Sequence, residues 1–203
     1  MLAILTAWDT QLFYTIHALR NSFLDAAMPL LSQPSLGWVI GGVVFAIWSV
    51  RIVFKNAAQQ RFRHMIFGMV LVLATSGLTE VVHHFVKYEV RRARPGHVLP
   101  NMHQYSREGW RYNTPEFAPK KYKGDSFFSG HAAHSAALVI SAVSICPPLN
   151  PLVYAVPLVV GYSRIYMGRH YPLDIVCGWA AGAAIALAVR RVSRRWLEKF
   201  RPK

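Results

Sequence analysis

Three short clusters of basic, hydroxyl and histidine side chains stand out in this sequence, and each lies at the end of an apolar segment. Together they supply two histidines, three cations that can bind phosphate, and a carboxylate four residues after the second histidine. These are the groups that covalent phosphoryl transfer needs when it proceeds without a metal. In chain order the clusters are Lys87 with Arg94 and Pro95, Ser129 with Gly130 and His131, and Ser163 with Arg164, His170 and Asp174.

His170 is the predicted nucleophile. It comes directly before Tyr171 and Pro172, and proline is favoured at the first position of a helix, so Asp174 is expected in the first turn of that helix. From there the carboxylate can reach back to the imidazole, fix its tautomer and leave the other ring nitrogen free to attack. A core histidine paired with an acid for stability is the alternative for an isolated pair of this kind, but it does not explain Arg164.

Ser129, Gly130 and His131 are predicted to open a helix after the turn-forming run 124–126. Backbone N–H groups at a helix start point outward and the helix dipole favours an anion, so a phosphate can bind there, with glycine allowing close approach. A serine N-cap with an incidental histidine is the alternative for this cluster alone. The two other clusters favour the phosphate site.

Arg164 lies near the end of an apolar segment, where a guanidinium is costly unless it meets an anion. Lys87 and Arg94 arrive from the end of another apolar segment. Three fixed cations and helix-terminal amides would neutralise the equatorial oxygens of a phosphoryl group during transfer. Arg91 and Arg92 are interpreted instead as side chains that extend toward water from the membrane edge.

The spacing of the clusters resembles the motifs of the type-2 phosphatidic acid phosphatase superfamily, which are KxxxxxxRP, PSGH and SRxxxxxHxxxD. The first and third motifs match residue for residue, over 87–95 and 163–174. The second matches over 129–131, with Phe128 at the place where the family usually has proline. The resemblance extends from about residue 60 to residue 190.

The resemblance also implies a role for each residue. By it, His170 becomes phosphorylated, Asp174 orients His170, and His131 protonates the leaving group and later activates water. It implies no metal and no other cofactor. The residues that match the family's phosphate-binding positions are Lys87, Arg94, Ser129, Gly130 and Arg164.

The composition is that of a membrane protein, because 16% of the 203 residues are charged and 53% are hydrophobic, against roughly 25% charged in soluble domains. A net charge of +14 would suit nucleic acid, but the basic residues gather at the ends of apolar runs, so we expect no nucleic-acid partner. Cys146 and Cys177 lie in apolar stretches, which indicates neither a disulfide framework nor a zinc site. Asp9 interrupts the first apolar run too early for a signal peptide, so insertion is expected to rely on the spans themselves.

Five segments are apolar over roughly the 20 residues that a transmembrane helix needs. Residues 1–33 are apolar but interrupted by charges, which predicts one or two helices lying in the membrane interface. We therefore expect a single all-α integral membrane domain over 1–203, a bundle of about five transmembrane helices resembling the acid phosphatase and vanadium haloperoxidase core. The predicted spans are about 36–54, 65–86, 129–146, 151–168 and 172–190.

The charges on the connections predict the orientation of the chain. Segment 51–64 and the tail 190–203 are basic and nearly free of acids, which predicts that both are cytoplasmic. Five spans put these segments on one side of the membrane. The N-terminus, the loop 87–128 and the turn 164–172 then face the other side, with all three clusters. The expected location is the bacterial inner membrane, with the site on the periplasmic face.

The resemblance and the topology together imply dephosphorylation of a lipid phosphate or diphosphate through a phosphohistidine. The strings 92–95 and 166–172 are most similar to bacterial undecaprenyl-diphosphate and phosphatidylglycerophosphate phosphatases, and phosphatidic acid is a third expected substrate. A lipid A 1-phosphatase, or transfer of the phosphoryl group to a second lipid, is the alternative. A non-catalytic lipid-binding or transport protein is an alternative of another class. The expected partners are the bilayer and a lipid substrate, and the oligomeric state stays open.

Four further ionisable residues lie close to the clusters in the sequence. Glu80, His83 and His84 precede Lys87 on one predicted span, and Glu80 and His84 stand four residues apart on one helical face. They are candidates for a functional site and equally for a satisfied pair near the interface. His134 follows His131 by one helical turn and could tune it or contact a head group.

Overall fold

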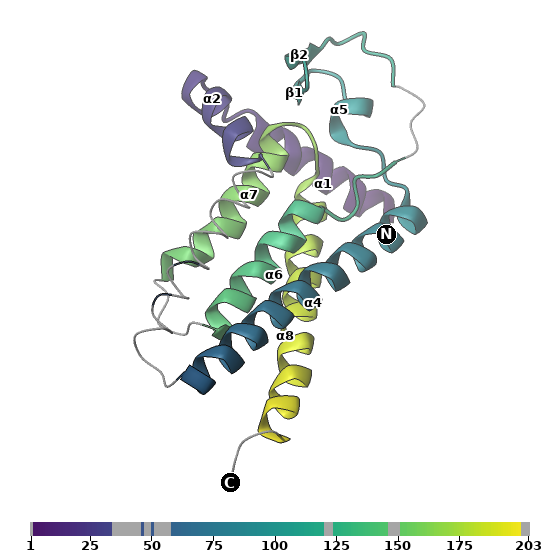
Figure 1. Cartoon of the computed structure of the whole chain (residues 1–203). Helices are drawn as coiled ribbons and strands as arrows, with labels where there is room; N and C mark the ends of the chain where they lie inside the picture. Colours follow the sequence, from purple (N-terminus) through teal and green to yellow (C-terminus); the bar gives the residue numbers. More distant parts are fainter. Residues whose placement is uncertain are drawn as a thin grey trace.

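Four helices, α4, α6, α7 and α8, run side by side, and α1 lies across one end of them (Figure 1). The computed structural model of the protein describes residues 2–33, 46, 50, 58–119, 124–145 and 151–199. The elements are α1 (Leu2–His17), α2 (Ser22–Leu31), α4 (Ala58–Val90), α5 (Pro95–Val98), β1 (Met102–Ser106), β2 (Gly109–Asn113), α6 (Gly130–Ile145), the 3₁₀ turn η1 (Pro151–Tyr154), α7 (Ala155–Tyr166) and α8 (Pro172–Lys199).

The centre of the bundle is α6, which packs most extensively on α8 and also contacts α4 and α7. Two glycines of α8 allow this close approach. A Cβ atom on Gly182 would overlap the backbone carbonyl of Ala133, and one on Gly178 would lie 2.7 Å from the carbonyl oxygen of Ser129. Small residues spaced four apart bring helix backbones together in this way in membrane proteins.

Among the α4 residues whose burial the structure describes, from Ile66 onward, the buried ones form a narrow stripe of Gly68, Leu71, Thr75, Thr79 and His83. The remaining surface of the helix is largely apolar and exposed, so that its most apolar stretch is 28% buried, and that of α8 is 33% buried. Apolar surface of this extent is unusual in a soluble protein. Both helices are long and apolar enough to cross a membrane.

The five predicted spans agree with the structure in part. Spans 65–86 and 172–190 lie within α4 and α8, the two helices of the described residues with the length and hydropathy of a span. Spans 129–146 and 151–168 contain α6 and α7, whose 16 and 12 residues are fewer than the roughly 20 needed to cross the hydrocarbon. Span 36–54 lies almost entirely outside the described residues, so a total of five stays a prediction.

The predictions for the two ends of the chain, 1–33 and 190–203, agree with the structure only in part. Residues 1–33 do form two helices, and their position in the membrane interface stays a prediction, as does the division of the chain into one domain with a cytoplasmic tail. The segment predicted as a tail from residue 190 is helical as far as Lys199. Its arginines, lysine, leucine and glutamate are all good helix formers, so α8 continues past its apolar part.

The described structure is mostly helical, as predicted, but the connection 87–128 also contains strands. This segment holds α5 and an antiparallel hairpin, in which Met102 of β1 lies opposite Asn113 of β2. Gly109 begins β2 with a φ of +98°, a conformation that glycine adopts without strain. The hairpin was missed because its aromatic residues are typical both of strands and of a membrane-interface belt.

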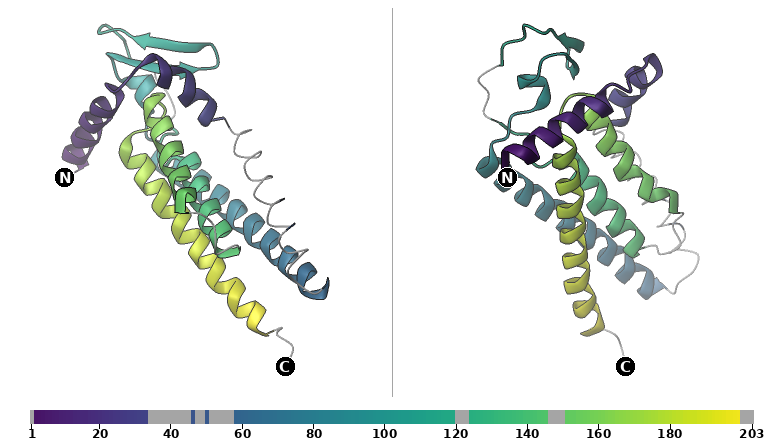
Figure 2. Two further views of the ribbon diagram at one scale, coloured as in Figure 1. Left: turned by 90° about the vertical axis from the view of Figure 1, so that its left-hand side faces the viewer. Right: turned by 180° about the vertical axis from the view of Figure 1, so that it is seen from behind.

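The end of the bundle under α1 has its own small core. Phe13 of α1 is fully buried and lies 5.8 Å from Tyr171, measured between ring centroids. Met102, Ile165 and Ile175 complete this cluster together with Ala132. Seen from behind, α1 crosses the bundle where α8 begins (Figure 2). The N-terminal helix, the hairpin and the ends of the long helices therefore pack around one shared core.

Replacing Gly182 with alanine should lower the melting temperature of the protein in detergent. The added methyl group overlaps the carbonyl of Ala133, so α6 and α8 must separate, at a cost of roughly 1–3 kcal/mol. The matched control is Gly77→Ala on α4, where an added Cβ meets nothing within 4 Å. This control should keep or raise the melting temperature, since alanine is the better helix former by about 1 kcal/mol. Equal responses of the two variants would contradict the close α6–α8 contact.

Candidate active site

The structure brings the three clusters together at one end of the bundle, where α4 and α7 end and α6 and α8 begin (Figure 1). Each cluster occupies a helix terminus or the link next to it. Lys87 lies in the last turn of α4, and Arg94 directly precedes α5. Ser129 directly precedes α6, which begins with Gly130 and His131. Arg164 lies in the last turn of α7, His170 lies between α7 and α8, and Asp174 lies in the first turn of α8.

The imidazole of His170 is buried, with 2% of the residue exposed. Its Nδ1 lies 2.8 Å from the backbone oxygen of Ser126 and 3.7 Å from Oδ2 of Asp174. A carbonyl oxygen only accepts hydrogen bonds, so Nδ1 of the ring must donate, and Nε2 of the neutral ring carries a free lone pair. The group that fixes the tautomer is therefore the Ser126 carbonyl, whereas the sequence predicted the carboxylate of Asp174.

Burial lowers the pKa of His170 from its usual value of 6.5 to about 4, and the charge of Arg164 acts in the same direction. The Asp174 carboxylate opposes both effects, but desolvation is the largest of them. At neutral pH the ring is therefore uncharged, which is the form in which an imidazole can act as a nucleophile.

Asp174 is fully buried, and its carboxylate accepts hydrogen bonds from three groups. The Ser126 hydroxyl donates to Oδ2 at 2.5 Å, the Tyr171 backbone N–H donates to the same oxygen at 3.0 Å, and a guanidinium nitrogen of Arg92 donates to Oδ1 at 2.7 Å. A buried carboxylate is tolerated only with partners of this kind. Asp174 therefore holds the Ser126 hydroxyl, and its own carboxylate lies 3.7 Å from Nδ1 of His170.

Two of the predicted phosphate-binding residues, Arg94 and Arg164, have guanidinium N–H groups without a hydrogen-bond acceptor in the described structure. Arg94 pairs with Asp125 at 2.7 Å, and Arg164 donates to the Ser32 hydroxyl. The Nε atoms of both arginines are buried and have no acceptor within the described part of the chain. Both arginines are close enough to His170 to act on its charge. They leave N–H groups available for an anion.

His131 and Lys87 both interact electrostatically with Arg164. His131 interacts electrostatically with Arg164, His170 and Lys87, and Lys87 interacts with Arg94 and Arg164. The side chain of His131 is partly exposed beside the buried His170. The three predicted cations and both predicted catalytic histidines therefore form one group.

The start of α6 has a packing role as well as its predicted role in binding. Ser129 is fully buried and its Oγ accepts from the N–H of Ala132 at 3.5 Å, as an N-cap does. A Cβ on Gly130 would lie 2.6 Å from Nε2 of His83 on α4. A side chain here would therefore displace the His83 ring, whether or not a phosphate binds.

The comparison with protein families decides what kind of protein this is. Residues 66–198, which include all three clusters, match the model of the PAP2 superfamily. The chain belongs to this superfamily. The predicted membership in the type-2 phosphatidic acid phosphatases is thereby confirmed, and with the apolar surfaces of α4 and α8 it makes this a membrane protein.

Individual PAP2 relatives resemble the chain over most of its length. A lipid A 4'-phosphatase of Porphyromonas gingivalis is 27% identical over 195 residues, which cover 93% of this chain and 76% of that protein. A lipid A 1-phosphatase of Rhizobium etli is 26% identical over 208 residues, covering 93% and 86%. The crystal structure of a PAP2 type phosphatidylglycerolphosphate phosphatase from Bacillus subtilis shares the fold, with a TM-score of 0.60 at 18% identity, covering 98% of this chain and 88% of that one.

The interpretation of Arg92 as a side chain extending toward water is wrong. Its guanidinium is largely buried, donates to Asp174 and to Asp9 at 2.5 Å, and lies 3.9 Å from the ring centroid of Tyr171. An acid inside an apolar helix was the available signal, because a charge such as Asp9 at a membrane needs a partner. Arg91 is exposed, with its Nε bonded to the backbone oxygen of Tyr88 at 2.9 Å, and fits the interpretation.

A second ionisable cluster flanks the site. Glu80, His83 and His84 offer ligand atoms that all lie within 4.8 Å of one another and could hold a metal ion. The expected pairing of Glu80 with His84 is present at 3.1 Å, and His134 of α6 joins it with Nε2 2.7 Å from Oε2 of Glu80. Since His134 follows His131 by one turn, this cluster lies beside the predicted reaction centre and does not include His170.

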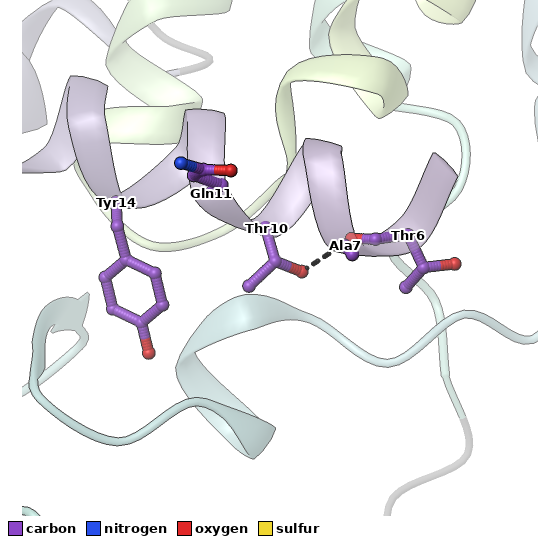
Figure 3. A pocket seen from close by; sticks show the side chains of 5 residues that line it. All are labelled: Thr6, Ala7, Thr10, Gln11 and Tyr14. Carbon is purple, nitrogen blue, oxygen red and sulfur yellow. Dashed lines mark hydrogen bonds between the residues drawn. The ribbon is translucent and has the colours of Figure 1, made fainter. Parts of the chain in front are cut away.

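A shallow hollow lies beside α1 (Figure 3). None of the predicted site residues lines it. Its lining carries no charge, and the Thr10 hydroxyl is used within the helix, where it donates to the backbone oxygen of Thr6 at 2.9 Å. The lining residues are Thr6, Ala7, Thr10, Gln11 and Tyr14.

The low pKa of His170 predicts a loss of stability in acid. Its folded-state pKa of about 4 is below that of an unfolded histidine, so the unfolded state binds a proton first as the pH falls through about 6.5. The stabilisation is complete above that pH and declines toward pH 4, by roughly 2 kcal/mol between pH 7 and pH 5. The melting temperature of the wild type should therefore fall more over this range than that of His170→Gln. Parallel declines would contradict the low pKa.

Proposed function

We propose that the protein is a phosphatase of membrane lipid phosphates, with His170 as the nucleophile. The observation that carries the proposal is a neutral, buried imidazole beside Arg94 and Arg164, whose buried Nε–H groups lack acceptors in the described structure. A tetrahedral phosphate offers oxygens for these donors and a phosphorus atom for the imidazole. Membership in the PAP2 superfamily and relatives named as lipid A phosphatases support the same function.

In the proposed reaction Nε2 of His170 attacks phosphorus, and the P–O bond to the lipid breaks as the P–N bond forms. Lys87, Arg94 and Arg164 hold the equatorial oxygens together with the start of α6. The negative charge of the phosphate offsets the cations that face His131, and so favours the protonated form that donates to the leaving oxygen. Water deprotonated by His131 then attacks phosphorus, the P–N bond breaks and inorganic phosphate leaves.

The substrate we place first is the phosphate of lipid A, because two relatives that cover most of the chain carry this name. Undecaprenyl diphosphate, phosphatidylglycerophosphate and phosphatidic acid complete the set of substrates to compare. All four join a phosphate to apolar chains, which suits a cationic site at the end of helices whose sides are apolar and exposed. Substrate entry from the bilayer follows from this arrangement.

The proposed chemistry uses no metal, because the chain's own cations neutralise the phosphate. None of the steps proposed above uses the cluster of Glu80, His83 and His84. We also propose that the site faces the periplasm at the inner membrane, on the basis of the basic segments 51–64 and 190–203.

His170→Ala should abolish phosphate release and the acid-labile labelling of the protein by a radioactive lipid phosphate. The assay uses the purified protein in detergent with the four lipids and with EDTA present. His103→Ala on β1, outside the proposed reaction, should retain activity. Labelling that persists in His170→Ala would remove His170 as the nucleophile. A wild type that releases phosphate only without EDTA would contradict the metal-free mechanism, and one that releases none from any lipid would contradict the function.

Single cysteines should report the orientation of the site. The exposed Glu108 in the hairpin turn and Ser193 on α8 are each replaced by cysteine in a chain lacking Cys146 and Cys177. A membrane-impermeant thiol reagent applied to spheroplasts should label position 108 and not position 193, and both positions after permeabilisation. The reverse pattern would place the site in the cytoplasm.

A further inference from the structure

We propose that Asp9 and Arg92 are positioning residues for the nucleophile, so that the N-terminal helix α1 is part of the active site. The proposal rests on the proposed function, with His170 as the nucleophile. It goes beyond the defining residues of the three motif clusters, because Asp9 lies outside all of them and Arg92 occupies an unspecified position within the first motif. Asp9 is 83 residues from Arg92 in sequence and 165 from Asp174, yet a chain of direct contacts links all three.

Asp9 is buried in α1, with 7% of the residue exposed, and uses both carboxylate oxygens. Oδ1 accepts from the backbone N–H of Leu173 at 2.8 Å, and Oδ2 accepts from Arg92 at 2.5 Å. Leu173 is the second residue of α8, and a carboxylate is favoured at the start of a helix by the exposed N–H groups and the dipole. Asp9 therefore fixes the place where α8 begins, immediately after His170 and Tyr171.

Arg92 touches both residues that determine the orientation of His170. Its guanidinium donates to Asp174 at 2.7 Å, and its backbone oxygen accepts from the N–H of Ser126 at 2.8 Å. Ser126 in turn accepts from Nδ1 of His170 and donates its hydroxyl to Asp174. The arginine also stacks on Tyr171, the neighbour of His170. The ring is therefore held through Ser126, and Arg92 holds Ser126 directly through its backbone oxygen and indirectly through Asp174.

The charge of Arg92 is already used by protein groups. Its two terminal nitrogens donate to two carboxylates, Asp9 and Asp174. Arg94 and Arg164, in contrast, keep buried Nε–H groups without acceptors in the described structure. Arg92 is therefore a poor phosphate ligand and well placed to keep Asp174 ionised at 3.7 Å from the imidazole, where the carboxylate stabilises the positive charge that the ring gains as Nε2 attacks.

This arrangement predicts a fall in kcat with little change in KM. Asp9→Asn keeps the size of the side chain and an acceptor for Leu173, but it loses the charge that holds Arg92. A nucleophile displaced by about 1 Å can lose on the order of 100-fold in rate, so we expect kcat and the rate of phosphoenzyme formation to fall about 10- to 100-fold. KM should stay within about threefold, because the cations that bind phosphate are untouched. Arg92→Lys should retain more activity than Arg92→Met.

The pH profile of kcat separates this role from a loss of stability. Asp9→Asn removes a negative charge near His170, which disfavours protonation of the ring and should move the acid limb to lower pH. Arg92→Met removes a positive charge and should move it to higher pH. The charged and titratable groups that face His170 from the packed elements are Asp174, Arg164, Arg94 and His131, and these are the same in both variants.

The control is Asp25→Asn, which breaks an ion pair of 2.6 Å with Arg20 in the same N-terminal region, away from His170. It should lower the melting temperature without changing kcat or the acid limb. The proposal is overturned if Asp9→Asn behaves like Asp25→Asn, or if the acid limbs of the Asp9 and Arg92 variants shift in the same direction. If Arg92→Met does not fold, Arg92→Lys and Asp9→Asn still decide the matter through kcat. Failure of the proposed function is distinguished earlier, by a wild type that releases no phosphate from any lipid.

Discussion

The burial of the Asp174 carboxylate is the constraint on which the rest of the site depends. A carboxylate without water is stable only where the fold supplies donors in its place. Those donors come from the Ser126 hydroxyl, the Tyr171 backbone and Arg92. Two distant parts of the chain, at Ser126 and at Arg92, must therefore converge on the first turn of α8. The convergence leaves His170 enclosed between them, with one ring nitrogen held and the other free.

The arginines at this end of the bundle differ in how their charge is balanced. Arg92 lies between two carboxylates, so its charge is neutralised inside the fold. The guanidinium of Arg164 has the neutral Ser32 hydroxyl as its described hydrogen-bond partner, and that of Arg94 has one carboxylate, from Asp125. Like charges at short range repel more strongly where water is scarce. An anion at this place therefore relieves a repulsion that the folded protein otherwise carries, and a doubly charged phosphate does so better than a neutral ligand.

The sequence predicted the parts of the site whose geometry is local. Pro172 and Asp174 lie on one helix start, and the predicted beginnings of α6 and α8 agree with the structure. Contacts between residues far apart in the sequence could not be predicted in this way. The orientation of His170 depends on a backbone carbonyl, which every residue has, and the role of Arg92 depends on Asp9. The hairpin in the connection was likewise missed, because its strands carry residues that are equally typical of a membrane interface.

Helix packing within the membrane-spanning part also determines the geometry of the site. The backbone N–H of Ser129 donates to the carbonyl of Asp174 at 3.0 Å, so the residue that precedes α6 is bonded directly to the first turn of α8. This bond requires the two helices to lie in contact, and Gly178 permits that contact because a side chain there would meet the Ser129 carbonyl. The distance between the predicted phosphate-binding end of α6 and the nucleophile is therefore determined by glycines one and two turns further along α8. The positions of Gly178 and Gly182 on α8 therefore determine how close the start of α6 lies to His170.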